Sequence, residues 1–185
     1  MSQELTFTTA SLFNATISSV SDAIYFDIQT PEWEPHLMTV RRLDPRAGTY
    51  ELTACVRNQA DKQVAVSMYG GEFEPEEQWV KKVGATIPGM GSRGQFDDGE
   101  GNMFTWSVGN GNLELCSTNE GVKTKRAIAT FYQHKQYFMV GMISQHTCLE
   151  IDNPVTESPD TIILSLLTIE RKRRAGKLAC FAFYP

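Results

Sequence analysis

The segment covering residues 159–174 most constrains what this chain can fold into. Residues 158–160 read Ser-Pro-Asp, which is typical of a helix start: a capping hydroxyl, a proline in the first turn and a carboxylate at the positive end. Six of the eight residues 162–169 are apolar and cover the whole circumference of a helix, and four cations follow at 171–174. A helix apolar on all sides must be enclosed, and this run is too short to cross a bilayer, so we expect protein to enclose it. A buried strand is the alternative, because isoleucine is β-branched.

The rest of the chain is dominated by alternating, strand-like segments. Candidate strands cover residues 5–9, 23–29, 38–43, 49–57, 64–69, 102–108, 112–118, 125–132 and 137–143. Short stretches rich in Pro, Gly, Asn and Asp separate most of them, and residues 133–136 are predicted to turn between the last pair. Regularly spaced strands with no helices between them favour an antiparallel barrel or sandwich.

Length and charge place the chain in a broad class. With 185 residues it suits a single domain over 1–185, and its net charge of −5 argues against nucleic acid as a partner. No stretch is apolar for long enough to form a transmembrane segment, and the first residues lack the pattern of a secretory signal. The four cysteines form no close C-x-x-C pair and could make two disulfides, but because the secretory pattern is lacking we expect buried thiols and a cytoplasmic location. The apolar tail at 178–185 is predicted to add a strand or to fill one end of a barrel.

Short motifs along the chain carry a resemblance to a known fold group. These motifs are residues 5–7, 14–16, 24–31, 39–42, 97–106, 149–151 and 168–174. In them the chain resembles an uncharacterised domain family of mushroom-forming fungi with a tubby-like fold, the fold of tubby C-terminal domains, phospholipid scramblases and LURP-one-related proteins. The resemblance implies a closed antiparallel barrel of about ten to twelve strands around one C-terminal hydrophobic helix. Tubby domains bind phosphoinositide in a cationic pocket outside the barrel, so it also points to an anionic lipid.

The basic residues are segregated, which favours an anionic partner. Residues 171–177 hold five of the 17 cations and no acid, which leaves 12 cations against 22 acids elsewhere. A field polarised in this way attracts anionic head groups or surfaces. The candidate ligand-binding cations outside this run are Arg41, Arg42, Lys81, Lys82, Lys123, Lys125 and Arg126. The simpler interpretation is that the cations at 171–174 stabilise a helix end and that those on strands are solvated.

No motif with established chemistry is present, so we expect neither a cofactor nor a metal. The three histidines are far apart, residues 97–101 depart from the calcium-loop pattern, and the glycine-rich loop at 84–94 contains no phosphate-binding motif. His146 and Cys148 are separated by one residue, which puts both on one face of a strand, but this spacing is expected to be coincidental.

Three functions therefore remain. The first, which we favour, is a non-enzymatic intracellular binding module for an anionic lipid or another amphiphile. The second is a small enzyme with a pocket at one barrel mouth, for which the candidate residues are Tyr25, Asp27, Asp98, Trp106 and His146. The third is a structural or defence-related domain that binds a protein partner through exposed edges.

Overall fold

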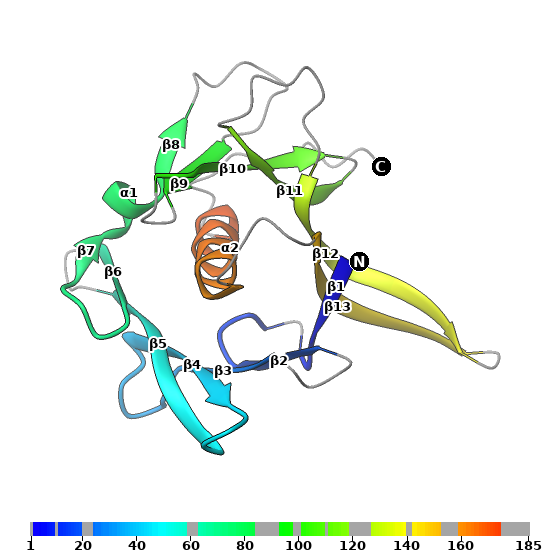
Figure 1. Ribbon diagram of the computed structural model, residues 1–185, viewed down its shortest axis with the longest axis horizontal. Coiled ribbons are helices and arrows are strands. Elements are labelled where there is room, and N and C mark those ends of the chain that lie inside the picture. Colours follow the sequence, from blue (N-terminus) through cyan, green and yellow to red (C-terminus); the bar gives the residue numbers. More distant parts are fainter. Residues whose placement is uncertain are drawn as a thin grey trace. The chain divides into compact units, whose positions relative to one another are not determined.

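The fold is known from a computed structural model. It describes residues 2–9, 11–19, 24–58, 63–83, 93–97, 101–109, 111–118, 127–139, 142–152 and 159–174. These residues form thirteen strands and two helices (Figure 1). The chain separates into two compact units, residues 1–76 with 131–151 and residues 77–130 with 152–185. The assignment of 1–185 to one domain stays a prediction.

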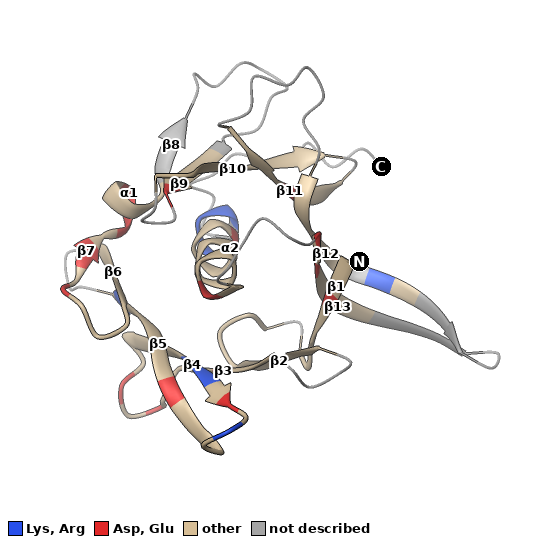
Figure 2. Cartoon of the chain, in the orientation of Figure 1, with Lys and Arg blue, Asp and Glu red and all other residues tan. Residues whose placement is uncertain are grey.

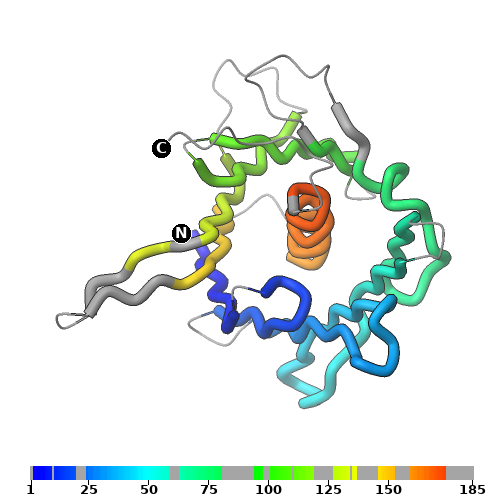
Figure 3. The backbone as a smooth tube through the Cα atoms, turned by 180° about the vertical axis from the view of Figure 1, so that it is seen from behind, coloured from blue at the N-terminus to red at the C-terminus, as the bar shows by residue number. Residues whose placement is uncertain are grey.

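The first unit is an antiparallel sheet whose consecutive strands are mostly neighbours. Its strands are β1 (Ser2–Phe7), β2 (Ala15–Ser19), β3 (Tyr25–Gln29), β4 (Leu37–Asp44), β5 (Thr49–Asn58), β6 (Val64–Met68), β7 (Glu74–Pro75), most of β12 (Ala127–Met139) and β13 (Met142–Asp152). They are ordered β7-β6-β5-β4-β3-β2-β1-β13-β12. Strands β2 to β5 lie side by side in views from opposite sides (Figures 1 and 3).

One face of this sheet is the core and the other carries polar residues. On β3 the side chains of Phe26 and Ile28 are buried, whereas Tyr25 and Asp27, which alternate with them, are partly exposed. This is the period-two pattern of a strand with one face on the core. The core side also includes Phe7, whose ring meets that of Phe131 edge to face at 5.8 Å between centroids. The polar face of β2–β4 is therefore available for a site.

The second unit contains the predicted helix. Strands β11 (Asn112–Ser117), β10 (Met103–Gly109), β9 (Arg93–Asp97) and β8 (Lys81–Val83) are hydrogen-bonded in this order, and the short helix α1 (Glu76–Trp79) precedes β8. Helix α2 (Pro159–Arg174) has the predicted bounds, and residues 160–170 are all buried. The prediction of an enclosed helix is confirmed and the alternative of a buried strand is wrong.

Contacts within the second unit explain how α2 is held. The indole Nε1 of Trp106 on β10 donates a hydrogen bond to Ser165 Oγ on α2 at 2.9 Å. Gly94 on β9 is buried, and a side chain there would overlap with Ile169 of α2. Near the end of α2, Lys172 Nζ donates to the backbone oxygen of Val80 at 3.2 Å.

Several predictions about the sheet need correction. The described strands number thirteen rather than ten to twelve, and the short strands β2, β7, β8 and β9 were not predicted. The predicted strand at 137–143 is also wrong in its bounds, because it covers the end of β12 and only the first two residues of β13. Residues 133–136, predicted as a turn, lie inside β12. Among the described strands, β7 and β8 each have a hydrogen-bonded neighbour on one side only, so a closed barrel is not confirmed. The tail at 178–185 lies outside the described residues.

Two further expectations concern thiols and membranes. Cys116 and Cys148 are buried and Cys55 is half-buried, and none of these three thiols forms a disulfide. Burial raises the pKa of the Cys55 thiol, with Arg57 acting in the opposite direction, which makes this thiol less reactive. Neither described helix combines the length and the hydrophobicity needed to cross a bilayer.

Candidate functional site

A surface pocket of about 480 Å³ lies on the polar side of the first unit, beside β2, β3 and the turn that follows β3. Its polar and aromatic lining comes mainly from Asn14, Thr16, Asp27, Gln29, Glu32 and Trp33. Every residue that lines it is described, so the pocket is defined within one unit. Its volume falls in the range of small-molecule sites.

Trp33 gives the pocket its most unusual feature, because 86% of its surface is exposed. It lies in the turn between β3 and β4, where Pro31 presets the backbone angle and its carbonyl accepts a hydrogen bond from Glu34 N at 3.0 Å. The turn continues as Leu37 N donates to Glu34 O at 2.9 Å. The turn therefore holds a large apolar ring away from the core, where tryptophan normally lies.

Hydrogen bonds connect this turn to the loop before β2. The backbone N–H of Thr30 donates to Asn14 Oδ1 at 2.7 Å, and the Thr30 hydroxyl donates to Phe13 O at 3.0 Å. The backbone N–H of Thr16 donates to the Thr8 hydroxyl at 2.9 Å. The bond from Thr30 N holds the Asn14 side chain at the pocket by its amide oxygen, so the amide N–H groups of Asn14 remain as donors.

The pocket wall on β3 is set by the strand register. Asp27 lies opposite Thr16 of β2 and opposite Arg41 of β4. The Arg41 guanidinium donates to Asp27 Oδ2 at 2.5 Å, which uses one carboxylate oxygen and orients the other. Arg41 also lies 5.5 Å from the centre of the Tyr50 ring. Asp27 is thus a positioned acceptor rather than a mobile surface acid.

Two tyrosines continue this polar face toward β5. The rings of Tyr25 and Tyr50 meet edge to face at 6.1 Å between centroids. Burial, a hydrogen bond with Tyr25 and the charge of Asp27 raise the pKa of Tyr50, although Arg41 acts in the opposite direction. Tyr50 therefore stays neutral at physiological pH and serves as a hydrogen-bonding and packing group.

The predicted anion-binding cations are distributed over both units. Arg41 and Arg42 point to opposite faces of β4, because Arg41 pairs with Asp27 whereas the Arg42 guanidinium lies 5.9 Å from the ring of buried Phe26. Figure 2 shows acidic and basic residues interspersed along β4 and β5. Lys81 and Lys82 lie on β8 in the second unit, and their side chains are not described. Lys123, Lys125 and Arg126 lie outside the described residues, so the anionic site stays a prediction.

The residues proposed for an enzyme differ in exposure and in their bonding partners. Tyr25 and Asp27 share one face of β3, but Trp106 is 1% exposed and hydrogen-bonded to Ser165. His146 on β13 is exposed, whereas Cys148 is fully buried. Asp98 lies outside the described residues. No group of His, Cys, Asp and Glu placed to hold a metal ion occurs among the residues that the structure describes.

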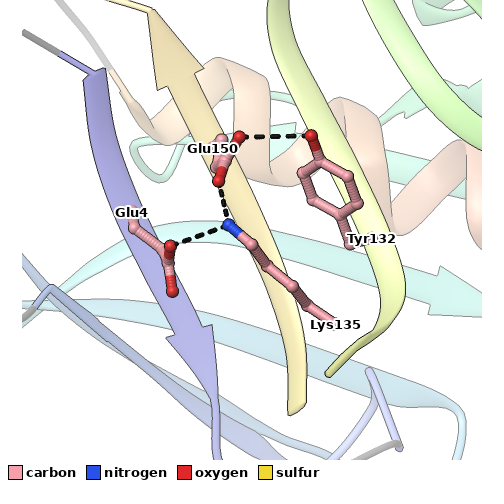
Figure 4. Close-up of polar contacts among 4 residues, drawn as sticks. All are labelled: Glu4, Tyr132, Lys135 and Glu150. Atoms are coloured by element: carbon pink, nitrogen blue, oxygen red, sulfur yellow. Dashed lines mark hydrogen bonds and ion pairs between the residues drawn. The ribbon is translucent and has the colours of Figure 1, made fainter. Parts of the chain in front are cut away.

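A second polar cluster, shown in Figure 4, joins β1, β12 and β13 of the first unit. Lys135 Nζ pairs with Glu4 Oε2 at 3.0 Å and with Glu150, and the Tyr132 hydroxyl donates to Glu150 Oε2 at 3.2 Å. Burial lowers the pKa of Lys135, but the hydrogen bonds to Glu150 and Glu4 outweigh it, and the net pKa is raised. The lysine is therefore fully charged, which suits it to holding strands together and not to nucleophilic or base catalysis.

Sequence reasoning missed both the pocket and this cluster. In the sequence nothing sets Trp33 apart from other turn residues, and only the flanking Pro31 and Pro35 indicate a loop. The cluster joins residues 4, 135 and 150, and nothing local indicates that they meet.

Comparison with known proteins identifies the family of the chain. No curated protein and no solved structure matches it. A family model described as a family of unknown function (DUF6593) matches residues 10–175, which is most of the 185 residues. The chain therefore belongs to the DUF6593 family.

Proposed function

We propose that this chain is a non-enzymatic binding module and that the pocket beside Trp33 is its ligand site. One observation carries the proposal: a largely exposed indole stands beside a pocket of about 480 Å³ whose walls are polar. Small-molecule sites combine apolar or aromatic surface with a few precisely placed polar groups that fix the orientation of the ligand. The positioned Asp27 and Asn14 side chains give such a site defined directions for hydrogen bonds.

The open position of Trp33 favours binding over catalysis. Its 86% exposure leaves the pocket wall in contact with water, which screens charges and weakens their effect on a transition state. Enzymes gain rate by excluding water around oriented dipoles. The alternative, a small enzyme, requires that a ligand or another segment cover this pocket.

The wider assignment to the fungal tubby-like group is also a proposal. Its support is an antiparallel sheet followed by one C-terminal helix with residues 160–170 buried. Within that proposal, an anionic lipid is a second candidate ligand, supported by the segregation of cations in the sequence. Sedimentation with phosphatidylserine or phosphoinositide vesicles tests it. We expect binding that weakens as salt is added. It should also be weaker in a variant with Lys123, Lys125 and Arg126 changed to Ala.

The pocket itself is tested by fluorine NMR of protein that contains fluorotryptophan. The chain has three tryptophans, and Trp33→Phe assigns the resonance of the exposed one. Compounds of contrasting chemistry are added: neutral sugars, choline, inorganic phosphate, fatty acids and anionic vesicles. We expect at least one class to shift the Trp33 resonance while the buried Trp106 resonance stays in place. If no class moves Trp33, the pocket is not a ligand site.

A further inference from the structure

We infer that the ligand of the Trp33 pocket is a neutral, polyhydroxylated molecule, that is, a carbohydrate. This inference rests on the proposed function and names the substrate class of the same site. It follows from the combination of one exposed aromatic plane with side chains that both donate and accept hydrogen bonds.

The aromatic plane suits one face of a sugar ring. A pyranose presents several C–H groups on one face, and these pack against a flat aromatic surface while the hydroxyls point outward to polar partners. Trp33 is the one aromatic residue among those that line the pocket, all of which are described, and 86% of its surface is exposed. An indole combines a large apolar surface with a polar N–H at its edge, so it can contact both parts of such a ligand.

The polar lining suits hydroxyl groups, which donate and accept at once. Asn14 has its amide oxygen engaged by Thr30 N, so its N–H groups remain as oriented donors. Asp27 has Oδ2 engaged by Arg41, so Oδ1 remains as an oriented acceptor. Two groups fixed in this way lower the entropy lost on binding.

Further lining residues extend this set of donors and acceptors. The side chains of Gln29 and Glu32 and the indole N–H of Trp33 have no hydrogen-bonding partner in the described structure. The Gln29 amide supplies a donor and an acceptor, and Glu32 supplies an acceptor. Vicinal hydroxyls of a sugar can bond both kinds of group side by side.

The charges of the pocket argue against other ligand classes. Its lining contains the carboxylates Asp27 and Glu32 and no cation, and the neighbouring Arg41 is already paired with Asp27. An anion would therefore be repelled. Quaternary ammonium ligands are usually enclosed by several aromatic faces, and this lining offers only Trp33. An acyl chain would leave the polar walls without hydrogen-bonding partners.

The test compares sugars with other probes on the folded chain that contains fluorotryptophan. Neutral gluco-, manno-, xylo- and chito-oligosaccharides are titrated separately, beside choline, inorganic phosphate and phosphatidylserine vesicles. We expect at least one oligosaccharide to shift the Trp33 resonance in a saturable manner, with no saturable shift from the other probes. Trp33→Ala should weaken that binding about tenfold or more in calorimetry, and Gln29→Ala should weaken it less.

Tyr69→Ala is the matched control, because Tyr69 is 61% exposed in the first unit but does not line the pocket. Trp79 and Trp106 lie in the second unit, so the folding of each variant is checked instead by urea unfolding followed by circular dichroism, with a midpoint and slope close to those of the wild type. If choline, phosphate or vesicles shift Trp33 and no sugar does, the carbohydrate inference is wrong and the binding module stands. If no probe shifts Trp33, both proposals fail.

Discussion

The hydrogen bond between Trp106 and Ser165 allows a quantitative test of how α2 is held in the second unit. The indole N–H donates to Ser165 Oγ at 2.9 Å, and that hydroxyl donates to Ile162 O at 2.8 Å. Trp106 is 1% exposed and Ser165 is fully buried. Ser165→Ala leaves the indole donor buried without its partner, which costs about 1–3 kcal/mol. Alanine's better helix propensity returns up to about 0.5 kcal/mol, so we expect a net loss of about 1–2 kcal/mol in the free energy of unfolding.

A double-mutant cycle isolates the hydrogen bond from the packing. Trp106→Phe removes the donor and part of a buried ring, so by itself it should cost about 2–3 kcal/mol. In that background Ser165→Ala no longer leaves an indole N–H unpaired, so its cost should fall by about 1 kcal/mol. Urea unfolding of the four proteins, followed by circular dichroism, gives each free energy and shows whether the slope m is unchanged. If the two changes add within about 0.5 kcal/mol, the bond contributes little and this reasoning is refuted.

Other predictions test packing and the polar cluster. Gly94→Ala would place a Cβ on Ile169 Cδ1, so we expect a loss of about 1–3 kcal/mol in unfolding experiments, part of which Ile169→Val should restore. Lys135→Met leaves Glu4 and Glu150 without their cation and should cost about 1–2 kcal/mol near neutral pH. Because the folded-state pKa of Lys135 lies above its ordinary 10.5, the cluster's stabilisation is complete below that pH and is lost as pH rises further. The difference in urea midpoint between wild type and Lys135→Met should therefore shrink above about pH 10.5, and a constant difference would contradict the assignment.

The helix could be predicted to the residue because both of its ends are marked locally. Residues 158–160 supply the start signals, and the cations at 171–174 follow the apolar run. The interior of β12 was mistaken for a turn because residues 133–136 are all polar. In the structure a charged residue lies inside this strand because Lys135 pairs with Glu4 and Glu150 from other strands. Long-range pairing of this kind leaves no periodic signal in the sequence.

Gly94 illustrates a second limit of sequence analysis. With three other glycines nearby, it was assigned to a loop at 84–94, because glycine is common where the chain turns. It belongs instead to β9, where the absence of a side chain lets α2 approach. Glycine is used both in turns and where another element packs closely against a strand, and only the position of the helix distinguishes the two uses.

The candidate site depends on strand register, which cannot be deduced from the positions of charged residues along the sequence. Arg41 and Arg42 form one cationic pair in the sequence. On a strand, however, adjacent residues face opposite sides of the sheet. The register of β3 and β4 then places Asp27 beside Arg41. The resulting ion pair has two consequences for function. It removes Arg41 as an uncommitted partner for an anion, and it holds the second Asp27 oxygen at a pocket beside exposed Trp33. One interaction thus weakens the case for an anionic ligand at this face and strengthens the case for a neutral one.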